Sequence, residues 1–258
     1  MLKIIVFCKP VPKGVRNVRL VEGKGAVACD SNSFLMNECD EYALEAALLW
    51  KKERGAEVTA ATMGGIRSQD ALYLAMAKGA DRALRIDADV NDSDAAARVL
   101  TEAVRGKGYD LILAGVESED NNASRVGTTV AEGLGFPHAF AVTKVAFGPE
   151  EGKIRVVTEL GGGVQEELEI RLPAVLSIQS GIAPLTYAAP AKIIRARKNP
   201  LDSMPLKETG LKLEQLEAER PRAVEVFEPP KSASAERITG TAEEIAGAIL
   251  DKVKHALG

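Results

Sequence analysis

The clearest pattern of apolar and polar positions lies between residues 109 and 137. An apolar run at 111–114 is too short for a helix and is bounded by Asp110 and Gly115, which predicts a buried strand. A polar loop follows at 116–123. Apolar residues then recur at helical spacing, at Val126, Val130 and Leu134. The stretch therefore predicts a strand, a loop and a helix, and the free N–H groups at the start of such a helix suit an anion.

The chain before and just after this stretch alternates in the same way. The pattern predicts strands at Lys3–Cys8, Val58–Thr62, Ala83–Ile86 and Ala139–Val142, and helices at 37–54, 68–78 and 93–106. Such alternation is typical of right-handed βαβ units and of a parallel sheet covered on both faces. We expect an α/β fold with a doubly wound parallel sheet in the strand order 3-2-1-4-5. In that order the loops after strands one and four share a crevice, where ligands of open α/β sheets bind.

The remaining chain departs from this pattern. Alternating charged segments, Lys153–Glu159 and Gln165–Arg171, flank three glycines and predict an added β-hairpin; because no helix follows the glycines, they are not a dinucleotide fingerprint. A further apolar strand is expected at 173–179. Arg195, Arg197 and Lys198 form a charge cluster of the kind that is usually a solvated face. We expect residues 1–200 to form the α/β domain and residues 201–258 an extended arm that ends in a helix at 241–256.

Composition narrows the functional classes. The chain has 258 residues and a formal net charge of -4, with no dominant basic stretch, which argues against nonspecific nucleic-acid binding. The three cysteines (Cys8, Cys29, Cys39) lack CxxC spacing and the two histidines (His138, His255) lie far apart, so we expect no metal site and no histidine-based triad. Because there is neither a run of eighteen apolar residues nor a signal pattern, we expect a cytoplasmic protein without membrane insertion.

The loop at 116–123 is longer than most strand-to-helix connections and is crowded with hydrogen-bonding side chains. Its three carboxylates would repel a bare phosphate but suit a ligand with a ribose or a base. Arg125, at the start of the next helix, has two readings: it contacts a phosphate, or it pairs on the surface with Glu117, Glu119 or Asp120. Asn37 likewise is either an N-cap of the first helix or a crevice residue.

Several longer stretches carry a resemblance to a known family. They are Ile4–Pro12, Met36–Ala47, Ala75–Asp81, Asp110–Gly115 leading into Asp120 and Val126-Gly127, Thr158–Gly163, Leu172–Val175 and Ile194–Leu201. Singly these patterns are weak, but in this order and spacing, over essentially the full chain, the sequence resembles the beta (small) subunit of electron-transfer flavoproteins.

The resemblance implies a heterodimer whose alpha subunit holds the redox-active FAD. Electrons would pass from acyl-CoA or related dehydrogenases through that flavin to a quinone reductase or another acceptor. The beta subunit would make no bonds itself and would bury AMP or, in flavin-bifurcating members that oxidise NADH, a second FAD. The arm and terminal helix would then dock on the alpha subunit, and the sheet would be of the adenine-nucleotide α-hydrolase and universal-stress type.

Motif by motif, the resemblance implies a set of nucleotide-binding residues. They are Phe7, Asn37, Glu38, Cys39, Asp40, Met63, Gly115, Val116, Glu117, Asp120, Asn121, Asn122, Ala123, Ser124, Arg125, Val126, Gly127 and Thr128. Glu159 matches a position that faces the alpha subunit, and Ala189 and Pro190 belong to the loop that recognises the dehydrogenase.

Departures from the family pattern bear on the ligand and the partner. The family commonly has Gln where this chain has Arg125, and Asp where it has Asn121 and Asn122; it has Leu at the position of Ala189, and Asn-Glu-Pro-Arg where this chain has residues 181–186. Three readings therefore stand: a beta subunit with AMP, a bifurcating beta subunit with FAD, and a stand-alone nucleotide-binding protein of the universal-stress type. The last leaves the arm and terminal helix unexplained.

Overall fold

The computed structural model describes residues 1–13, 16–21, 26–30, 34–90, 92–218, 227, 230 and 235–257. The chain divides into two compact units. The first consists of Met1–Arg19 and Ala28–Ala223, and the second of Leu20–Val27 and Val224–Gly258. Parts of the expected arm, at 219–226, 228–229, 231–234 and 258, lie outside the described residues.

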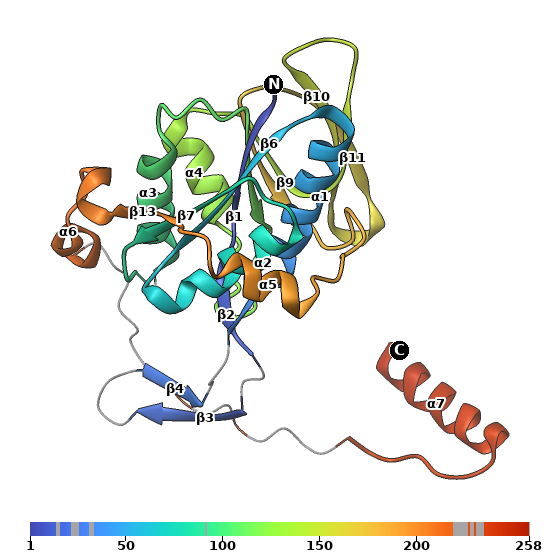
Figure 1. The fold of residues 1–258 in the computed structure, drawn as a ribbon. Helices are drawn as coiled ribbons and strands as arrows, with labels where there is room; N and C mark the ends of the chain where they lie inside the picture. Colours follow the sequence, from blue (N-terminus) through green and yellow to red (C-terminus); the bar gives the residue numbers. More distant parts are fainter. Residues whose placement is uncertain are drawn as a thin grey trace. The chain divides into compact units, whose positions relative to one another are not determined.

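The first unit is built on one sheet, to which the described residues contribute nine strands (Figure 1). Their order across the sheet is β11-β10-β9-β12-β8-β1-β6-β7-β13. Their bounds are β1 Lys3–Phe7, β6 Glu57–Met63, β7 Arg82–Asp87, β8 Leu111–Gly115, β9 His138–Phe147, β10 Lys153–Glu159, β11 Gln165–Arg171, β12 Ala174–Ile178 and β13 Asp202–Pro205. Neighbouring strands in the part of this order that reads β9-β12-β8-β1-β6-β7-β13 pair in parallel. β10 and β11 are added beside β9 and pair antiparallel.

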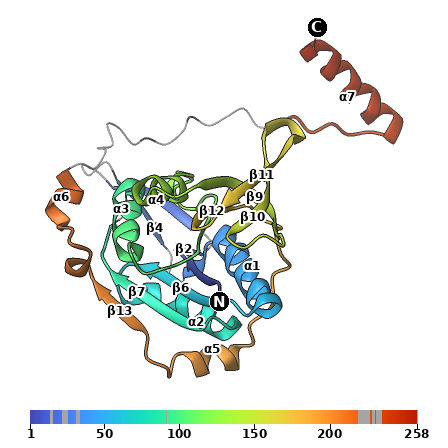
Figure 2. The ribbon, with the colours of Figure 1, turned by 90° about the horizontal axis from the view of Figure 1, so that it is seen from above.

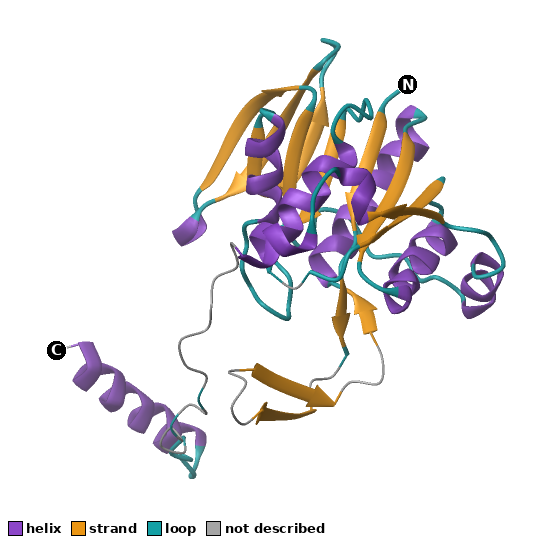
Figure 3. Ribbon diagram, turned by 90° about the vertical axis from the view of Figure 1, so that its left-hand side faces the viewer, coloured by secondary structure: helices purple, strands orange, loops and turns teal. Residues whose placement is uncertain are grey.

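Helices cover both faces of the sheet, as Figure 2 shows from above. Helices α1 (Glu38–Arg54) and α2 (Gln69–Lys78) pack on one face, and α3 (Ser93–Val104) and α4 (Val126–Leu134) on the other. Strands covered on both sides favour apolar residues throughout, and β1 and β8 are accordingly almost continuous apolar runs, whereas β6 also buries Thr59 and Thr62. Figure 3 shows the strands of this sheet in orange and the helices in purple.

The expected doubly wound α/β fold is confirmed, with one insertion in the strand order. β7, β6, β1 and β8 follow each other as the order 3-2-1-4 requires. The place beside β8 is taken by β12, and the expected fifth strand, β9, lies one place further out. The chain enters β9 first, makes the predicted hairpin of β10 and β11, and then returns through β12 to fill the gap. The short apolar run of β12 is buried at every position, as an inner strand requires.

Residues 202–218 belong to the first unit, beyond the boundary expected at residue 201. β13 pairs in parallel with β7 at the edge of the sheet, and Arg82 Nη2 bonds Asp202 Oδ2 at 2.8 Å. The short helix α6 (Leu213–Ala218) then places Leu216 against the α3 side of the core, where it is only 2% exposed. This segment packs on the core through a few spaced leucines, although most of its residues are polar.

Smaller elements complete the described chain. β2 (Pro10–Pro12) pairs with β5 (Phe34–Met36), and β3 (Arg16–Val21) with β4 (Ala26–Asp30). Helix α5 (Pro190–Ala196) packs on α2. In the second unit, α7 (Ala242–Leu257) begins with a capping box, in which Thr241 and Glu244 exchange hydrogen bonds. Nothing among the helices of the described chain has the length and apolar character needed to cross a bilayer.

Candidate functional site

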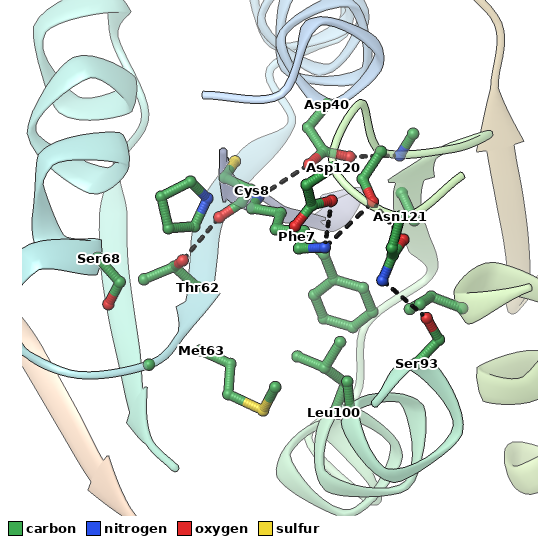
Figure 4. Close-up of a pocket in the computed structure, with 18 of the residues that line it drawn as sticks. Phe7, Cys8, Asp40, Thr62, Met63, Ser68, Ser93, Leu100, Asp120 and Asn121 are labelled. Atoms are coloured by element: carbon green, nitrogen blue, oxygen red, sulfur yellow. Dashed lines mark hydrogen bonds and ion pairs between the residues drawn. The ribbon is translucent and has the colours of Figure 1, made fainter. Parts of the chain in front are cut away.

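A cleft of about 500 Å³ opens at the carboxyl ends of β1, β6 and β8. This is the switch point of the doubly wound sheet, where the chain leaves β1 and β8 toward opposite faces. Carboxylates and amides, including Asp40, Asp120 and Asn121, lie on one side in Figure 4, and Met63 and Leu100 lie on the other. The cleft therefore combines an apolar wall with a row of hydrogen-bonding groups, as small-molecule sites do.

Asp40 ties the two sides of the switch point together. It lies in the first turn of α1 and is 6% exposed, and its carboxylate accepts hydrogen bonds from the backbone N–H of Lys9 at 2.8 Å and of Gly115 at 2.7 Å. Burial raises the pKa of Asp40 to about 6, and the two N–H bonds partly oppose that rise. One carboxylate thus fixes the loops that follow β1 and β8.

Gly115 is required where β8 passes the start of α1. A Cβ at this position would lie 2.5 Å from Asp40 Oδ1 and 2.7 Å from Cys39 Cβ. Contacts this short with a helix N-terminus leave room only for hydrogen. The glycine is therefore explained by close approach, since its φ is not in the left-handed region.

Asn37 precedes α1, but its side chain makes no capping hydrogen bond, so the N-cap reading was wrong. The side chain is 1% exposed and turns to the loop after β8. There Nδ2 donates to the carbonyl of Glu117 at 2.7 Å, and Oδ1 accepts from the N–H of Glu119 at 3.1 Å. Asn37 does not line the cleft; it holds the loop that does.

Lys9 was missed by the sequence reasoning, although it follows strand one directly. Its Nζ donates to Asp120 Oδ1 at 2.6 Å and to Ser118 Oγ at 3.1 Å. Asn121 continues the chain of contacts by bonding Ser93 Oγ at 3.2 Å, at the start of α3. These polar contacts therefore connect the end of β1 to the start of α3 beside the cleft. In the sequence, the only indication of them was Lys9 itself, a cation at the carboxyl end of the first strand.

Arg125 lines the cleft and pairs with a carboxylate that was not foreseen. Its Nη1 contacts Asp94 Oδ2 at 2.9 Å, and both side chains are about half exposed. Neither Glu117, Glu119 nor Asp120 forms an ion pair with it among the described contacts. An exposed ion pair of this kind contributes roughly 0–1 kcal/mol, so Arg125 remains able to turn toward a ligand.

The structure brings most of the expected residues to the cleft. Those that line it are Phe7, Asp40, Met63, Gly115, Val116, Glu117, Asp120, Asn121, Ala123, Ser124, Arg125 and Val126. Those that do not are Asn37, Glu38, Cys39, Asn122, Gly127 and Thr128. Gly127 instead packs against β12, where a Cβ would lie 2.3 Å from Ser177 Oγ. Thr62 near the end of β6 and residues after β6 and β7, among them Arg67, Ser68 and Val90, were also missed because no motif marks them.

The expected partner-facing residues lie away from the cleft. Glu159 is exposed at the end of β10, and Pro190 is exposed in the first turn of α5, whereas Ala189 before it is half-buried. None of the three lines the cleft.

The chemistry of the cleft is that of binding. Burial raises the pKa of the Cys8 thiol well above its usual value and raises that of Cys39 as well, so neither is an activated nucleophile. Within the described ranges, no three His, Cys, Asp or Glu side chains are grouped to hold a metal ion. The arrangement offers backbone N–H groups, hydroxyls and carboxylates for hydrogen bonding beside an apolar wall.

Comparison with known proteins agrees with this architecture. Residues 25–209 match the family described as electron transfer flavoprotein domain. The electron transfer flavoprotein subunit beta of Methylophilus methylotrophus is 32% identical, and the alignment covers all of both chains. The subunit of the same name from Syntrophomonas wolfei is 34% identical over 86% of this chain and 87% of its own.

A third relative comes from a larger complex. It is the caffeyl-CoA reductase-Etf complex subunit CarD of Acetobacterium woodii, 30% identical over 98% of each chain. The family match, these full-length similarities and the doubly wound sheet point the same way, and the chain belongs to the family of electron transfer flavoprotein beta subunits.

Proposed function

We propose that this chain is the nucleotide-holding subunit of a heterodimeric electron-transfer flavoprotein. An alpha subunit would carry the redox-active FAD and pass electrons from an acyl-CoA or related dehydrogenase to a quinone reductase or another acceptor. This chain would bind AMP in its cleft and perform no bond-making step of its own. The observation that supports the nucleotide most directly is the cleft itself, which lies at the switch point and joins an apolar wall to a polar rim.

Each part of an adenine nucleotide has a counterpart among the lining residues. Met63, Val90 and Leu100 offer an apolar surface for the base. The carboxylates of Glu117 and Asp120 suit ribose hydroxyls, which donate hydrogen bonds. The start of α4, with Arg125 beside it, suits a phosphate because helix N–H groups and a guanidinium both favour negative charge there.

AMP is the first candidate because its base, ribose and single phosphate each have a counterpart among the lining residues, whereas FAD would also need contacts for a second phosphate and for the flavin ring. The alternative is a flavin-bifurcating protein with FAD in the same cleft, which would make the complex an enzyme that oxidises NADH. Arg125 supports that alternative, since an extra cation suits a diphosphate. The stand-alone sensor is disfavoured, because the relative from Methylophilus methylotrophus is named as a beta subunit and matches this chain along its whole length.

Titration calorimetry of nucleotide-free protein with AMP, ADP and FAD tests the assignment. We expect AMP to bind, and Arg125→Gln to weaken ADP and FAD more than AMP, because only the former carry a second phosphate for the guanidinium to meet. Asp94→Asn is the matched control, since it removes the same ion pair but keeps the guanidinium. The proposal fails if wild-type protein binds none of the three; equal small effects on all three would show that Arg125 does not read the second phosphate.

A further inference from the structure

Residues 181–198, here called the 181–198 segment, connect β12 to β13 and are unusual in composition. They contain no acidic residue and four basic ones, in a chain whose net charge is -4. They also expose large apolar side chains: Leu185 is 42%, Tyr187 85% and Ile194 61% exposed. Exposed apolar residues among cations favour contact with an acidic protein surface that has an apolar hollow.

The first half of this segment is attached to the domain through a buried lysine. Lys78, the last residue of α2, has a side chain only 1% exposed. Its Nζ contacts Glu41 Oε1 at 2.6 Å and Glu45 Oε1 at 2.5 Å, both on α1, and donates to the carbonyl of Thr186 at 2.7 Å. Lysine is rarely buried so completely unless each of its donors is used, as here.

Glu45 on α1 forms the second connection to Thr186. It is 5% exposed, and the same Oε1 accepts hydrogen bonds from the N–H of Thr186 at 2.9 Å and from its hydroxyl at 2.7 Å. Thr186 is thus held through its carbonyl, its N–H and its hydroxyl. The residue lies between the exposed Leu185 and Tyr187, so the network fixes the backbone at the point where the apolar side chains project.

The second half of the segment is attached more weakly. Arg197 Nη2 contacts Asp70 Oδ1 at 2.9 Å, and its guanidinium lies 5.8 Å from the centre of the Tyr73 ring. Both charged side chains are more than half exposed. Exposed pairs contribute little to stability, whereas breaking a buried pair is strongly destabilising. The conformation near Thr186 therefore depends mainly on Lys78 and Glu45.

We propose that Lys78 is a positioning residue that presets the 181–198 segment for docking with the dehydrogenase. The idea rests on the proposed function, in which a dehydrogenase delivers electrons to the heterodimer, and on the family resemblance, which implies that Ala189 and Pro190 belong to the loop that recognises it. A segment held in its bound conformation before binding loses less conformational entropy on association, which strengthens the complex without new contacts. Lys78 touches neither the cleft nor the surface itself and acts only through Thr186 and Glu45.

The first experiment measures amide hydrogen exchange of the full chain with its alpha partner, for wild type, Lys78→Met and Lys51→Met. Lys51 is a matched control, because its Nζ also binds a carboxylate, Asp81 Oδ1 at 2.6 Å, and a carbonyl, that of Gly79 at 2.8 Å, but contacts no residue of the segment in these hydrogen bonds. Exchange in residues 181–189 should accelerate in Lys78→Met alone. Equal protection of residues 181–189 in Lys78→Met and Lys51→Met would overturn the proposal that Lys78 fixes the segment. If Lys78→Met does not fold, Thr186→Val, at an exposed position, tests the same network by removing the hydroxyl bond to Glu45, and it should likewise accelerate exchange in residues 181–189.

The second experiment follows reduction of the heterodimer's flavin by an acyl-CoA dehydrogenase and its acyl-CoA, over a range of heterodimer concentrations. Lys78→Met should raise KM roughly tenfold, the equivalent of about 1.4 kcal/mol, with little change in kcat. Lys51→Met should change neither, and both variants should retain the same nucleotide. An unchanged KM in Lys78→Met would overturn the docking role. If wild-type protein is not reduced, the proposed electron donor and this role both fall, while nucleotide content still tests the cleft separately.

Discussion

Asp40 shows how much one side chain contributes at the scale of the residue. It is buried, it carries no cation as a direct partner among its described hydrogen bonds, and it joins the loops after β1 and β8 through two backbone N–H groups. Burial disfavours the charged form, which raises the pKa from 3.8 to about 6. Asp40, which lines the cleft, therefore titrates near neutral pH.

This shift predicts a pH dependence of stability. The folded state binds the proton of Asp40 more tightly than the unfolded state, so the contribution of Asp40 to stability is full below about pH 4 and is lost as the pH rises to about 6. Two pKa units correspond to roughly 3 kcal/mol. Urea unfolding of wild type should show a decline in the free energy of unfolding over this window, and Asp40→Asn should flatten it.

Asp89→Asn is the control, because Asp89 lines the same cleft but is exposed. It should leave the decline between pH 4 and pH 6 unchanged. If Asp40→Asn and wild type lose stability equally over that window, Asp40 does not titrate as its burial implies.

At the scale of the element, the site depends on how closely β8 passes the start of α1. Gly115→Ala places a methyl group against Asp40 and Cys39, so α1 or β8 must shift. Overpacking of this kind costs roughly 1–3 kcal/mol. We expect a lowered free energy of unfolding and reduced retention of nucleotide, measured by urea unfolding and by chromatography of the nucleotide released on heating.

Gly65→Ala provides the comparison. Gly65 also lines the cleft, its φ is not in the left-handed region, and a Cβ there meets no atom within 4 Å. It should change stability little. Equal losses in the two variants would show that the close approach at Gly115 is not what fixes the loop.

The elements of the first unit could largely be predicted from the sequence, because their periodicity is strong. Strands β1, β6 and β8 are apolar runs, and α1 to α4 end at glycines or polar residues within a few positions of the expected bounds. The place of β12 could not be predicted, since its apolar run fits any inner position of a sheet. β13 was missed because it packs on the core through one large apolar residue, Met204.

Site residues could be predicted only where a recognisable motif lay on a strand beside the switch point of the sheet. Phe7, Asp40 and Gly115 reach the cleft because each lies at or near the end of β1, the start of α1 or the end of β8. Apart from Met63, which the family resemblance marked, the residues brought in from β6 and from the loops after β6 and β7 carry no local signal. Asn37 has the sequence of a cap, but its amide satisfies the Glu117–Glu119 backbone instead, and that choice depends on tertiary contacts.

At the scale of the whole molecule, the two units imply different roles for the two parts of the expected arm. Residues 202–218 complete the sheet edge and bury Leu216. Helix α7 belongs to the second unit and exposes Ile249, Leu250 and Val253, which form an apolar stripe. We propose that α7 docks on the alpha subunit, whereas residues 202–218 serve the domain's own stability.

Two truncations separate these roles. A chain ending at residue 218 should keep the unfolding free energy of the first unit but bind the alpha subunit more weakly, as measured by size-exclusion chromatography of the mixture. A chain ending at residue 201 should in addition lose several kcal/mol, since fully burying one leucine contributes roughly 1.5–3 kcal/mol. Unchanged heterodimer affinity in the 218 variant would contradict the docking role of α7.

The central claim is that the cleft of this subunit holds AMP while the flavin lies in the alpha subunit. The most direct test is to denature the purified heterodimer by heat and to quantify the released nucleotides by chromatography. We predict equimolar AMP and FAD, with AMP reduced in Gly115→Ala and retained in Gly65→Ala. Two equivalents of FAD per heterodimer without AMP would establish the bifurcating alternative. One equivalent of FAD and no other nucleotide would contradict a nucleotide site in this chain.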